Sequence, residues 1–574
     1  MDRPRAHRPH LAAALAALPA LLAGLFLAGS PAASGCRPPP KRKGSADPER
    51  ELGRLATLVF AGDTVLARRM HWGVTDTEAR EPLGALRPLF DGADLSLVNL
   101  EGVLSSRGEM QDKGERNSFY FRGRPDLVRI LVEGGIDVVT LANNHAGDYG
   151  PEALLDALEI LDAAGIQHVG AGATPEQAAA PIYRRAGDVV VAVIGLDATQ
   201  ASFGVRRGRA GTNYANEGRP DELVAAVRAA VERARRHAHL VFLTVHWGPN
   251  NADEPTPERR ALARRLIEEA GIDAVLGHSA HRAQGIEIHR GRPILYDAGN
   301  LLWDYDDEGP SHRGLAFRLH FDRSGVRWIE AIPIRLRKNR TTLDDDPAEA
   351  LERLAGLCRA LGTELVRRPG SGEGAGAEVG VLVVEPRYAP PAPAGPAETP
   401  PEPARRTPPP AVLFPTPDTV VAALPADANR FDPPVAFENG IELLGWQIET
   451  PRIRRHRPLF VRTWWRTSRP VEARWEVFLH PDPTREGQER FAGGGAGEHE
   501  PGDWSYPTNR WRPGEIVEDR FDVRPFPDVP PGTYELFVGL WRPDTRVRLR
   551  PLDEARTDGG RRVRLGVFEQ TAEP

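Results

Sequence analysis

The clearest strand-to-helix transition in the sequence is "VVTLANNHAGDYGPEALLDALEILDAAG", residues 138–165. It begins with apolar, β-branched residues, and residues 151–165 carry apolar residues at helical spacing. Asn143, Asn144 and His145 lie between the two patterns, and Asp148 follows them. Polar residues at the carboxyl end of a strand are typical of a ligand site in an α/β sheet. The interpretation depends on whether other strands end in the same way.

Several other apolar runs do end in polar residues. They are "TLVFAGD" ending at Asp63, "LSLVNLE" with Asn99 and Glu101, "LVFLTVHWG" with His246, "DAVLGHSAH" with His278 and His281, and "ILYDAGN" ending at Asn300. Helical patterns such as residues 257–271 intervene, and this alternation predicts an α/β sheet with parallel portions. Because ligands bind beyond the carboxyl ends of such strands, we expect the polar clusters to converge at an exposed edge.

The composition of these clusters indicates a metal site. Asp, Glu, Asn and His suit Mn, Fe, Zn or Mg, and two such ions could polarise a phosphoryl or acyl group and generate hydroxide. A cation would also stabilise two carboxylates that would otherwise repel each other. We therefore expect two divalent ions. The expected ligands are Asp63, Glu101, Asn144, His145, His246, His278 and His281.

Further roles are expected within the same set. His145 and His246 are candidate catalytic groups, and Asp148 would orient His145. The expected substrate-binding residues are Asn99, Asn143 and Asn300. Each residue also has an ordinary structural explanation: the paired asparagines could form a turn, and a single histidine is often a hydrogen-bonded core residue. The whole set is harder to explain in that way.

Length and composition limit the other functions. The chain has 574 residues, which is too long for one core, and its net charge of −6 implies no general affinity for nucleic acid. With only two cysteines, Cys36 and Cys358, it has neither a disulfide framework nor a thiolate-rich metal site. The sequence contains neither a G-x-S-x-G elbow nor a phosphate-binding G-x-x-x-x-G-K-[ST] loop, which argues against a serine hydrolase and an ATP-driven ligase.

The N-terminus is typical of an export signal. Basic residues precede an apolar run, residues 11–28, and the small residues of "GSPAASGC" follow. This ending resembles a bacterial lipoprotein signal, although Ala33 stands where Leu is usual, and it predicts a leader over 1–35 and a lipid on Cys36. The alternative is an uncleaved membrane anchor. Both place the chain at the extracytoplasmic face of the membrane, with residues 36–54 as a tether.

A Pro-rich linker, residues 386–418, separates two kinds of pattern. Beyond it, residues 419–574 contain short alternating strands such as "ARWEVFL" and "TYELFVGLW", which predict an all-β sandwich that serves as a binding or spacing module. Tryptophans are frequent there and could form either a sugar-stacking surface or, more simply, part of the core. They are Trp464, Trp465, Trp475, Trp504, Trp511 and Trp541.

Six motifs in order resemble the CapA family of capsule and poly-γ-glutamate synthesis proteins. They are "FAGDTVLAR", "VNLEGVLS", "LANNHAGDYG", "VHWG", "GHSAH" and "YDAGN". The resemblance covers residues 55–385 and implies a four-layer α/β/β/α domain similar to the calcineurin-like metallophosphatases, followed here by the sandwich. Departures from the family pattern are Ala280 in place of Pro, Asp297 in place of Ser, and Pro249 with Asn250 where Glu often follows.

The resemblance also implies a function. The chain is expected to act in the synthesis of a capsule or poly-γ-glutamate-type envelope polymer through a metal-dependent hydrolase-like site. Its partners would be an anionic polymer or a phosphate or acyl substrate, together with membrane synthase subunits and the membrane itself, but no nucleic acid. The alternative is a non-catalytic assembly factor that holds or escorts the polymer.

Overall fold

The computed structural model describes residues 55–384 and 419–571, apart from short internal stretches. Those stretches are 72–80, 112, 114–118, 305–311, 338, 371–373, 375, 377, 455–457, 493–496, 503–505, 524, 527–528 and 543–544. The expected leader, the lipidation residue Cys36, the tether and the Pro-rich linker therefore lie outside the described residues. Within the described ranges, no helix is both long enough and apolar enough to span a membrane.

The first sheet of the α/β region has ten strands in the order β19-β20-β17-β16-β1-β2-β5-β6, with β15 beside β1 and β18 beside β17. β1, β2, β5 and β6 are parallel, as the strand–helix alternation predicts, whereas β16 and β17 extend the sheet in antiparallel fashion. The strands are β1 (Ala56–Thr64), β2 (Leu95–Leu100), β5 (Val138–Thr140), β6 (Gln167–Val169), β15 (Asn300–Leu302), β16 (Arg313–Asp322), β17 (Gly325–Arg337), β18 (Arg340–Leu343), β19 (Val366–Pro369) and β20 (Glu378–Val383).

The second sheet has six strands in the order β13-β14-β12-β11-β9-β8. Its four inner strands are parallel, and β8 and β13 pair with them in antiparallel fashion at the edges. The strands are β8 (Ile182–Ala186), β9 (Val189–Asp197), β11 (Leu240–His246), β12 (Ala274–His278), β13 (Ile286–His289) and β14 (Arg292–Leu295).

Helices and short elements connect these strands. The α-helices are α2 (Arg87–Asp91), α3 (Val128–Gly134), α4 (Gly150–Ala163), α5 (Pro175–Ala178), α6 (Pro220–Ala234), α7 (Pro257–Glu268) and α8 (Ala348–Ala360). The short elements are η1 (Arg68–His71), η2 (Gly84–Leu86), η3 (Pro125–Leu127), η4 (Ala201–Phe203), β3 (Val103–Leu104), β4 (Arg122–Gly123), β7 (Ala171–Gly172) and β10 (Gly211–Thr212).

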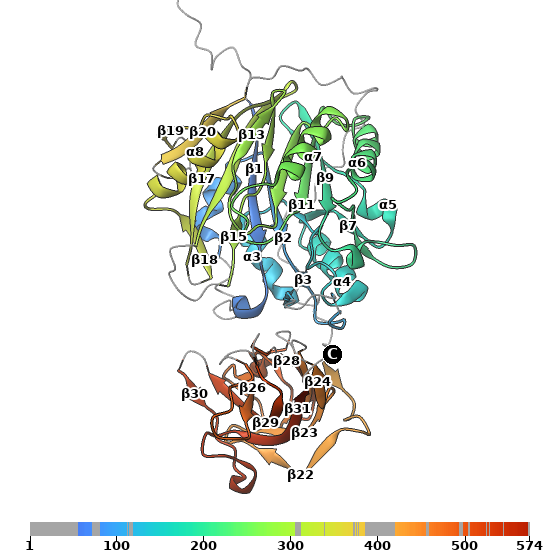
Figure 1. Ribbon diagram of the computed structural model, residues 1–574, viewed down its shortest axis with the longest axis vertical. Coiled ribbons are helices and arrows are strands. Elements are labelled where there is room, and N and C mark those ends of the chain that lie inside the picture. Colours follow the sequence, from blue (N-terminus) through green and yellow to red (C-terminus); the bar gives the residue numbers. More distant parts are fainter. Residues whose placement is uncertain are drawn as a thin grey trace, which may run out of the picture. The chain divides into compact units, whose positions relative to one another are not determined.

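Three hydrophobic cores arise because both faces of each sheet are apolar. Phe60 of β1 and Phe242 of β11 belong to one cluster, so the two sheets bury a common core between them. The next residue on β1, Val59, points the other way and packs with α3 and α4. On β11, Val241 does the same with α6 and α7 (Figure 1). Continuous apolar strands of this kind are typical of sheets that are covered on both faces.

The region after the Pro-rich segment is built from strands, as predicted, and these form two further sheets. One contains β21 (Val420–Val421), β28 (Ile516–Val523), β25 (Leu459–Thr467), β23 (Ile441–Ile448) and β22 (Asn429–Ala436). The other contains β24 (Arg452–Arg454), β31 (Val563–Thr571), β29 (Gly532–Arg542), β26 (Glu476–Pro483), β27 (Glu498–His499) and β30 (Val547–Arg548). The short helices η5 (Thr508–Arg510) and η6 (Glu554–Arg556) lie in the connections.

The tryptophans of this region serve mainly its core. Trp464 and Trp465 are fully buried and Trp511 is nearly so, so the sugar-stacking alternative is wrong for these three. Trp465 packs in one cluster with Leu536 of the other sheet, which means that the two sheets share a core. Trp475 and Trp541 are half-buried, and Trp504 lies outside the described residues.

Candidate metal centre

The end of β1 carries the first carboxylate of the site. Asp63 is fully buried and lies in register with Asn99 of β2 and Asn300 of β15. Position 62 requires a glycine because the backbone of Gly299 lies close to it: a Cβ at position 62 would lie 1.8 Å from the carbonyl oxygen of Gly299. The Asn99 side chain donates a hydrogen bond of 2.8 Å to Asp63 Oδ1 and so fixes the orientation of the carboxylate.

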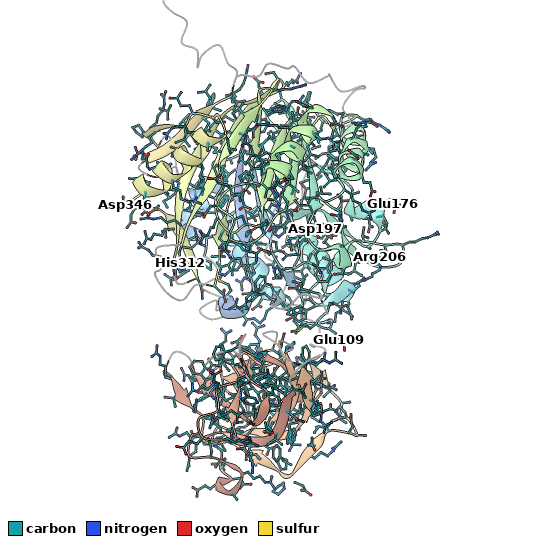
Figure 2. The ribbon with its side chains drawn as sticks, viewed as in Figure 1. Glu109, Glu176, Asp197, Arg206, His312 and Asp346 are labelled. Atoms are coloured by element: carbon teal, nitrogen blue, oxygen red, sulfur yellow. The ribbon has the colours of Figure 1, made fainter. Side chains whose placement is uncertain are left out.

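The second sheet supplies histidines from strands that end side by side. Asp197, His246 and His278 are in register at the ends of β9, β11 and β12 (Figure 2 labels Asp197). The Nδ1 atoms of His246 and His278 lie 2.7 Å apart, and the Thr244 hydroxyl lies 3.0 Å from His278 Nε2. Asp197 accepts hydrogen bonds from Thr199, Gln200 and Thr212 and so shapes the loop beyond β9.

Groups from both sheets meet at Asp63 and Glu101. His281 Nδ1 lies 2.9 Å from Asp63 Oδ2, and His278 Nδ1 lies 3.9 Å from Asp63 Oδ1. His145 Nε2 and His246 Nε2 each lie 3.8 Å from Glu101 Oε1. The predicted residues therefore converge, but all of them except the half-buried Asn144 and His281 are buried, so the expectation of an exposed edge is wrong. Contacts between the two sheets accompany this burial, such as that of His281, in the loop after β12, with Asp63 of β1.

Two groups of three residues have the geometry to bind a cation. Asp63, His246 and His278 form one group, and Asp63, Glu101 and His281 form the other. Within each group, one potential ligand atom per residue lies within 4.8 Å of the others. Asp63 belongs to both groups, which is the position of a bridging carboxylate.

Two buried oxygen-bearing groups lack the partners that burial demands. Among the described residues, none donates a hydrogen bond to either carboxylate oxygen of Glu101, which is fully buried. The buried Asn144 Oδ1 likewise has no partner in the described part of the chain. Buried polar atoms are almost always paired, and an unpaired carboxylate is costly. A cation coordinated by these oxygens would remove that cost, so the donor set fits a metal.

The charge states of the histidines also suit metal binding. Burial lowers the pKa of His278 to about 4, and burial together with His278 lowers the pKa of His246 well below its usual value. Both rings are therefore neutral near pH 7, which is the form that binds metal. Burial opposes a charge on His281, but the Glu101 and Asp63 carboxylates outweigh it and raise its pKa to about 10. Without metal, His281 holds a proton and forms an ion pair with Asp63.

Glu101 carries the opposite perturbation. Burial, and then the nearby charge of Asp63, raise the pKa of Glu101 well above its usual value. Asp63 itself stays ionised: although burial opposes its charge, the hydrogen bond from His281 and the nearby rings lower its pKa. Without a cation, Asp63 and Glu101 together therefore carry less than two negative charges.

A second network orients His145. Its Nδ1 lies 2.7 Å from Asp148 Oδ2, and its ring stacks on Phe121 at a centroid distance of 4.1 Å. The buried Lys113 ammonium lies 2.6 Å from Asp148 Oδ1 and donates to the carbonyl oxygen of Phe119 at 3.0 Å. Burial lowers the pKa of His145 to about 4, so its Nδ1–H is donated to Asp148 and the bare Nε2 faces Glu101.

The three asparagines expected at the substrate are used within the site. Asn143 donates to Asn99 Oδ1 at 2.9 Å and to the carbonyl oxygen of Leu100 at 2.8 Å, and its own Oδ1 accepts the His145 backbone N–H at 3.0 Å. It therefore fastens the "NNH" segment to β2. Asn300 Oδ1 lies 3.2 Å from His281 Nδ1. Direct contact of these residues with substrate stays a prediction.

Comparison with known proteins gives one consistent result. Residues 57–305, which contain the expected ligands, match the family described as bacterial capsule synthesis protein PGA_cap. The chain is 36% identical over 221 residues to a probable polyglutamine synthesis accessory protein of Mycobacterium tuberculosis, and the match covers 38% of this chain and 57% of the relative. The chain thus spans less than two thirds of the length of that relative.

Two further relatives are more distant but match over longer segments. The capsule biosynthesis protein CapA of Bacillus anthracis is 26% identical over 291 residues, which cover 50% of this chain and 69% of the relative. The PGA biosynthesis protein CapA of Bacillus subtilis is 25% identical over 281 residues, which cover 49% and 71%. All of these matches leave a large part of this chain uncovered.

Proposed function

Because this chain belongs to the CapA family of capsule and poly-γ-glutamate synthesis proteins, we propose that it is a metal-dependent hydrolase acting in the synthesis of an anionic envelope polymer. The observation that carries this proposal is the Glu101 carboxylate. It is fully buried without a hydrogen-bond donor among the described residues, and ring nitrogens of three histidines lie 3.8 Å from its oxygens. A cation is the group that such an arrangement lacks.

The site would hold two divalent ions of Mn, Fe, Zn or Mg. Asp63, His246 and His278 would bind one, and Asp63, Glu101 and His281 the other. Asn144 would add its unpaired amide oxygen. A mixed oxygen and imidazole set suits these metals, whereas a thiolate site is excluded because the buried Cys358 belongs to the hydrophobic core between the two sheets.

When bound, such ions polarise a phosphoryl or acyl oxygen and supply hydroxide at neutral pH. The remaining work falls to the side chains around them. His145 would present its unprotonated Nε2 to exchange a proton with the reacting oxygen, while Asp148 accepts its Nδ1–H and holds the ring in this tautomer. Lys113 would hold the Asp148 carboxylate in place through their contact. The full burial of Asp63 and Glu101 would keep bulk water away from their carboxylates.

The rest of the chain would place this site at the membrane. We propose a lipid on Cys36 and an extracytoplasmic location, with the strand-rich C-terminal region as an accessory module and a membrane synthase as partner. The distribution of the cores supports a four-layer α/β/β/α domain, because one core lies between the sheets and one lies on each outer face. A purely escorting role is not favoured, since binding a polymer would not require a bare carboxylate buried among histidines.

Hydrolysis assays on the full chain would test this proposal. Chain stripped with chelator and reloaded with Mn²⁺ should hydrolyse phosphomonoester, phosphodiester or γ-glutamyl model substrates, and the stripped chain should not. Glu101→Gln should abolish the metal-dependent rate. His289→Ala, in which the lost histidine pairs with Glu268 outside the site, should retain it. Equal rates with and without metal would overturn the proposal.

A further inference from the structure

The loop after β12 has an unusual backbone. Ser279 and His281 both lie in the left-handed region, with φ of 119° and 59°, although neither is a glycine. Such conformations are unfavourable for residues with a Cβ and persist only where their surroundings impose them. This loop is short, yet it separates His278 from His281, which belong to different candidate metal positions.

The two peptide groups of Ala280, which lies between Ser279 and His281, are both hydrogen-bonded. The Ala280 N–H donates to Asp297 Oδ2 at 2.7 Å, and the Ala280 carbonyl oxygen accepts from the Asn251 N–H at 2.8 Å. The other oxygen of Asp297 accepts the Gly299 N–H at 2.8 Å. Asp297 is 1% exposed, so these hydrogen bonds form away from water, where leaving a partner unpaired is costly.

The Ala280 N–H and the Asp297 side chain are partners in space. A proline at position 280 would have no N–H to pair. Here Ala280 introduces a buried N–H, and a buried N–H requires an acceptor. The carboxylate of Asp297 supplies that acceptor at 2.7 Å.

We propose that Asp297 is a positioning residue that sets the separation of the two metal positions by holding the peptide of Ala280. The carboxylate would act through this loop. At one end of the loop, His278 would bind the ion held with Asp63 and His246, and at the other end His281 would bind the ion held with Asp63 and Glu101. This inference rests on the proposed metal centre. It adds a group outside the ligand set whose loss would disturb the spacing of the two ions.

Titration of the full chain with Mn²⁺, followed by electron paramagnetic resonance, would test the assignment. The wild type should bind two Mn²⁺ ions and give the spin-coupled spectrum of a bridged pair. Asp297→Ser should weaken binding of the second ion about 10- to 100-fold, the usual range for groups that orient ligands, and should lose the coupled spectrum. The double variant Ala280→Pro, Asp297→Ser removes the unpaired N–H and should recover most of the loss.

Controls separate this effect from a general loss of stability. Asp273→Ser also removes a buried carboxylate that accepts a backbone N–H, that of Val241 at 2.8 Å, but at the opposite end of the second sheet. It should destabilise the chain and leave the coupled spectrum intact. Asp297→Leu removes both acceptor oxygens but keeps the side-chain size, and should weaken binding of the second ion even if the serine variant does not fold.

The outcomes distinguish the two levels of the argument. Wild-type affinity in the folded Asp297→Ser or Asp297→Leu variant would overturn the role of Asp297 while the metal centre stands. A double variant that binds no better than Asp297→Ser would overturn the pairing with Ala280. A wild-type chain that binds no Mn²⁺ would overturn the metal centre, and the role of Asp297 with it.

Discussion

The Nδ1 atoms of His246 and His278 lie 2.7 Å apart at the ends of neighbouring parallel strands. Two ring nitrogens at this distance either share the N–H hydrogen of one neutral ring or face a common cation. Burial lowers the pKa of both rings, so both are neutral near pH 7 and each keeps a nitrogen lone pair that can bind a cation. The register of β11 and β12 thus prepares a pair of nitrogen ligands, and Asp63 lies close enough to complete it.

Replacing Glu101 should separate stability from metal binding. In Glu101→Met the buried group without a hydrogen-bond donor is gone, so the metal-free chain should gain about 1–3 kcal/mol in free energy of unfolding, the usual cost of leaving a buried polar group unsatisfied. Metal binding should weaken strongly. Thermal unfolding and Mn²⁺ titration measure the two effects. A variant that is less stable without metal would show that Glu101 has a structural partner instead.

Metal affinity should rise with pH. His281 has its pKa raised to about 10 by the neighbouring carboxylates, so binding at neutral pH must release its proton. Affinity should therefore increase about tenfold per pH unit for each proton released, from pH 6.5 toward pH 9. Calorimetry in buffers of different ionisation enthalpy counts the protons. His281→Ala should bind more weakly and show a shallower slope, and an unchanged slope would contradict the assignment.

Lys113 should affect catalysis more than metal content. Lys113→Met leaves the buried Asp148 carboxylate without its cation and should destabilise the chain by about 3–5 kcal/mol. His145 would lose its fixed orientation, so the hydrolytic rate should fall about 10- to 100-fold with both ions still bound. Rate, metal content and thermal unfolding are measured together. The control is Arg235→Met, which breaks the partly buried pair with Asp273 and should lower stability alone.

The convergence of the candidate ligands could be predicted because each strand shows in the sequence as an apolar run with polar residues at its end. Asp63, His246 and His278 each end an apolar run, and parallel strands bring such ends to one edge of a sheet. The sequence predicted that these residues converge, but not that they are buried. It could not show that two sheets face each other, so that the Asn99 amide of the first lies 3.5 Å from His246 of the second, 147 residues away.

Other features of the structure could not be predicted from periodic patterns in the sequence. Lys113 lies in a polar segment without strand or helix spacing, and its burial follows from the fold around Asp148. The bond between Ala280 and Asp297 joins two loops, and each residue alone read as an unexplained departure. The role of the tryptophans after residue 419, in the core or on a surface, was ambiguous. Alternation along a strand shows which side chains share a face of the sheet, but not which face is covered by the other sheet.

Membrane attachment is a prediction from the leader sequence. The wild-type chain should partition with membranes and carry a lipid on Cys36, because small residues precede this cysteine after an apolar run. Cys36→Ser should release the chain or block its processing, whereas Cys358→Ser should have no effect on attachment, since that thiol is buried in the core. Fractionation and intact-mass measurement report both. A soluble wild-type chain that retains residues 1–35 would contradict the prediction.

Anomalous diffraction from crystals of the full chain grown with Mn²⁺ tests the metal centre most directly. Two peaks about 3.5–4 Å apart are expected, the spacing of two-metal hydrolases. Asp63 should bridge them, with His246 and His278 on one ion and Glu101 and His281 on the other. His246→Ala crystals should lose the first peak. Wild-type crystals with no anomalous density at Asp63, at Mn²⁺ concentrations that saturate binding in solution, would contradict the account.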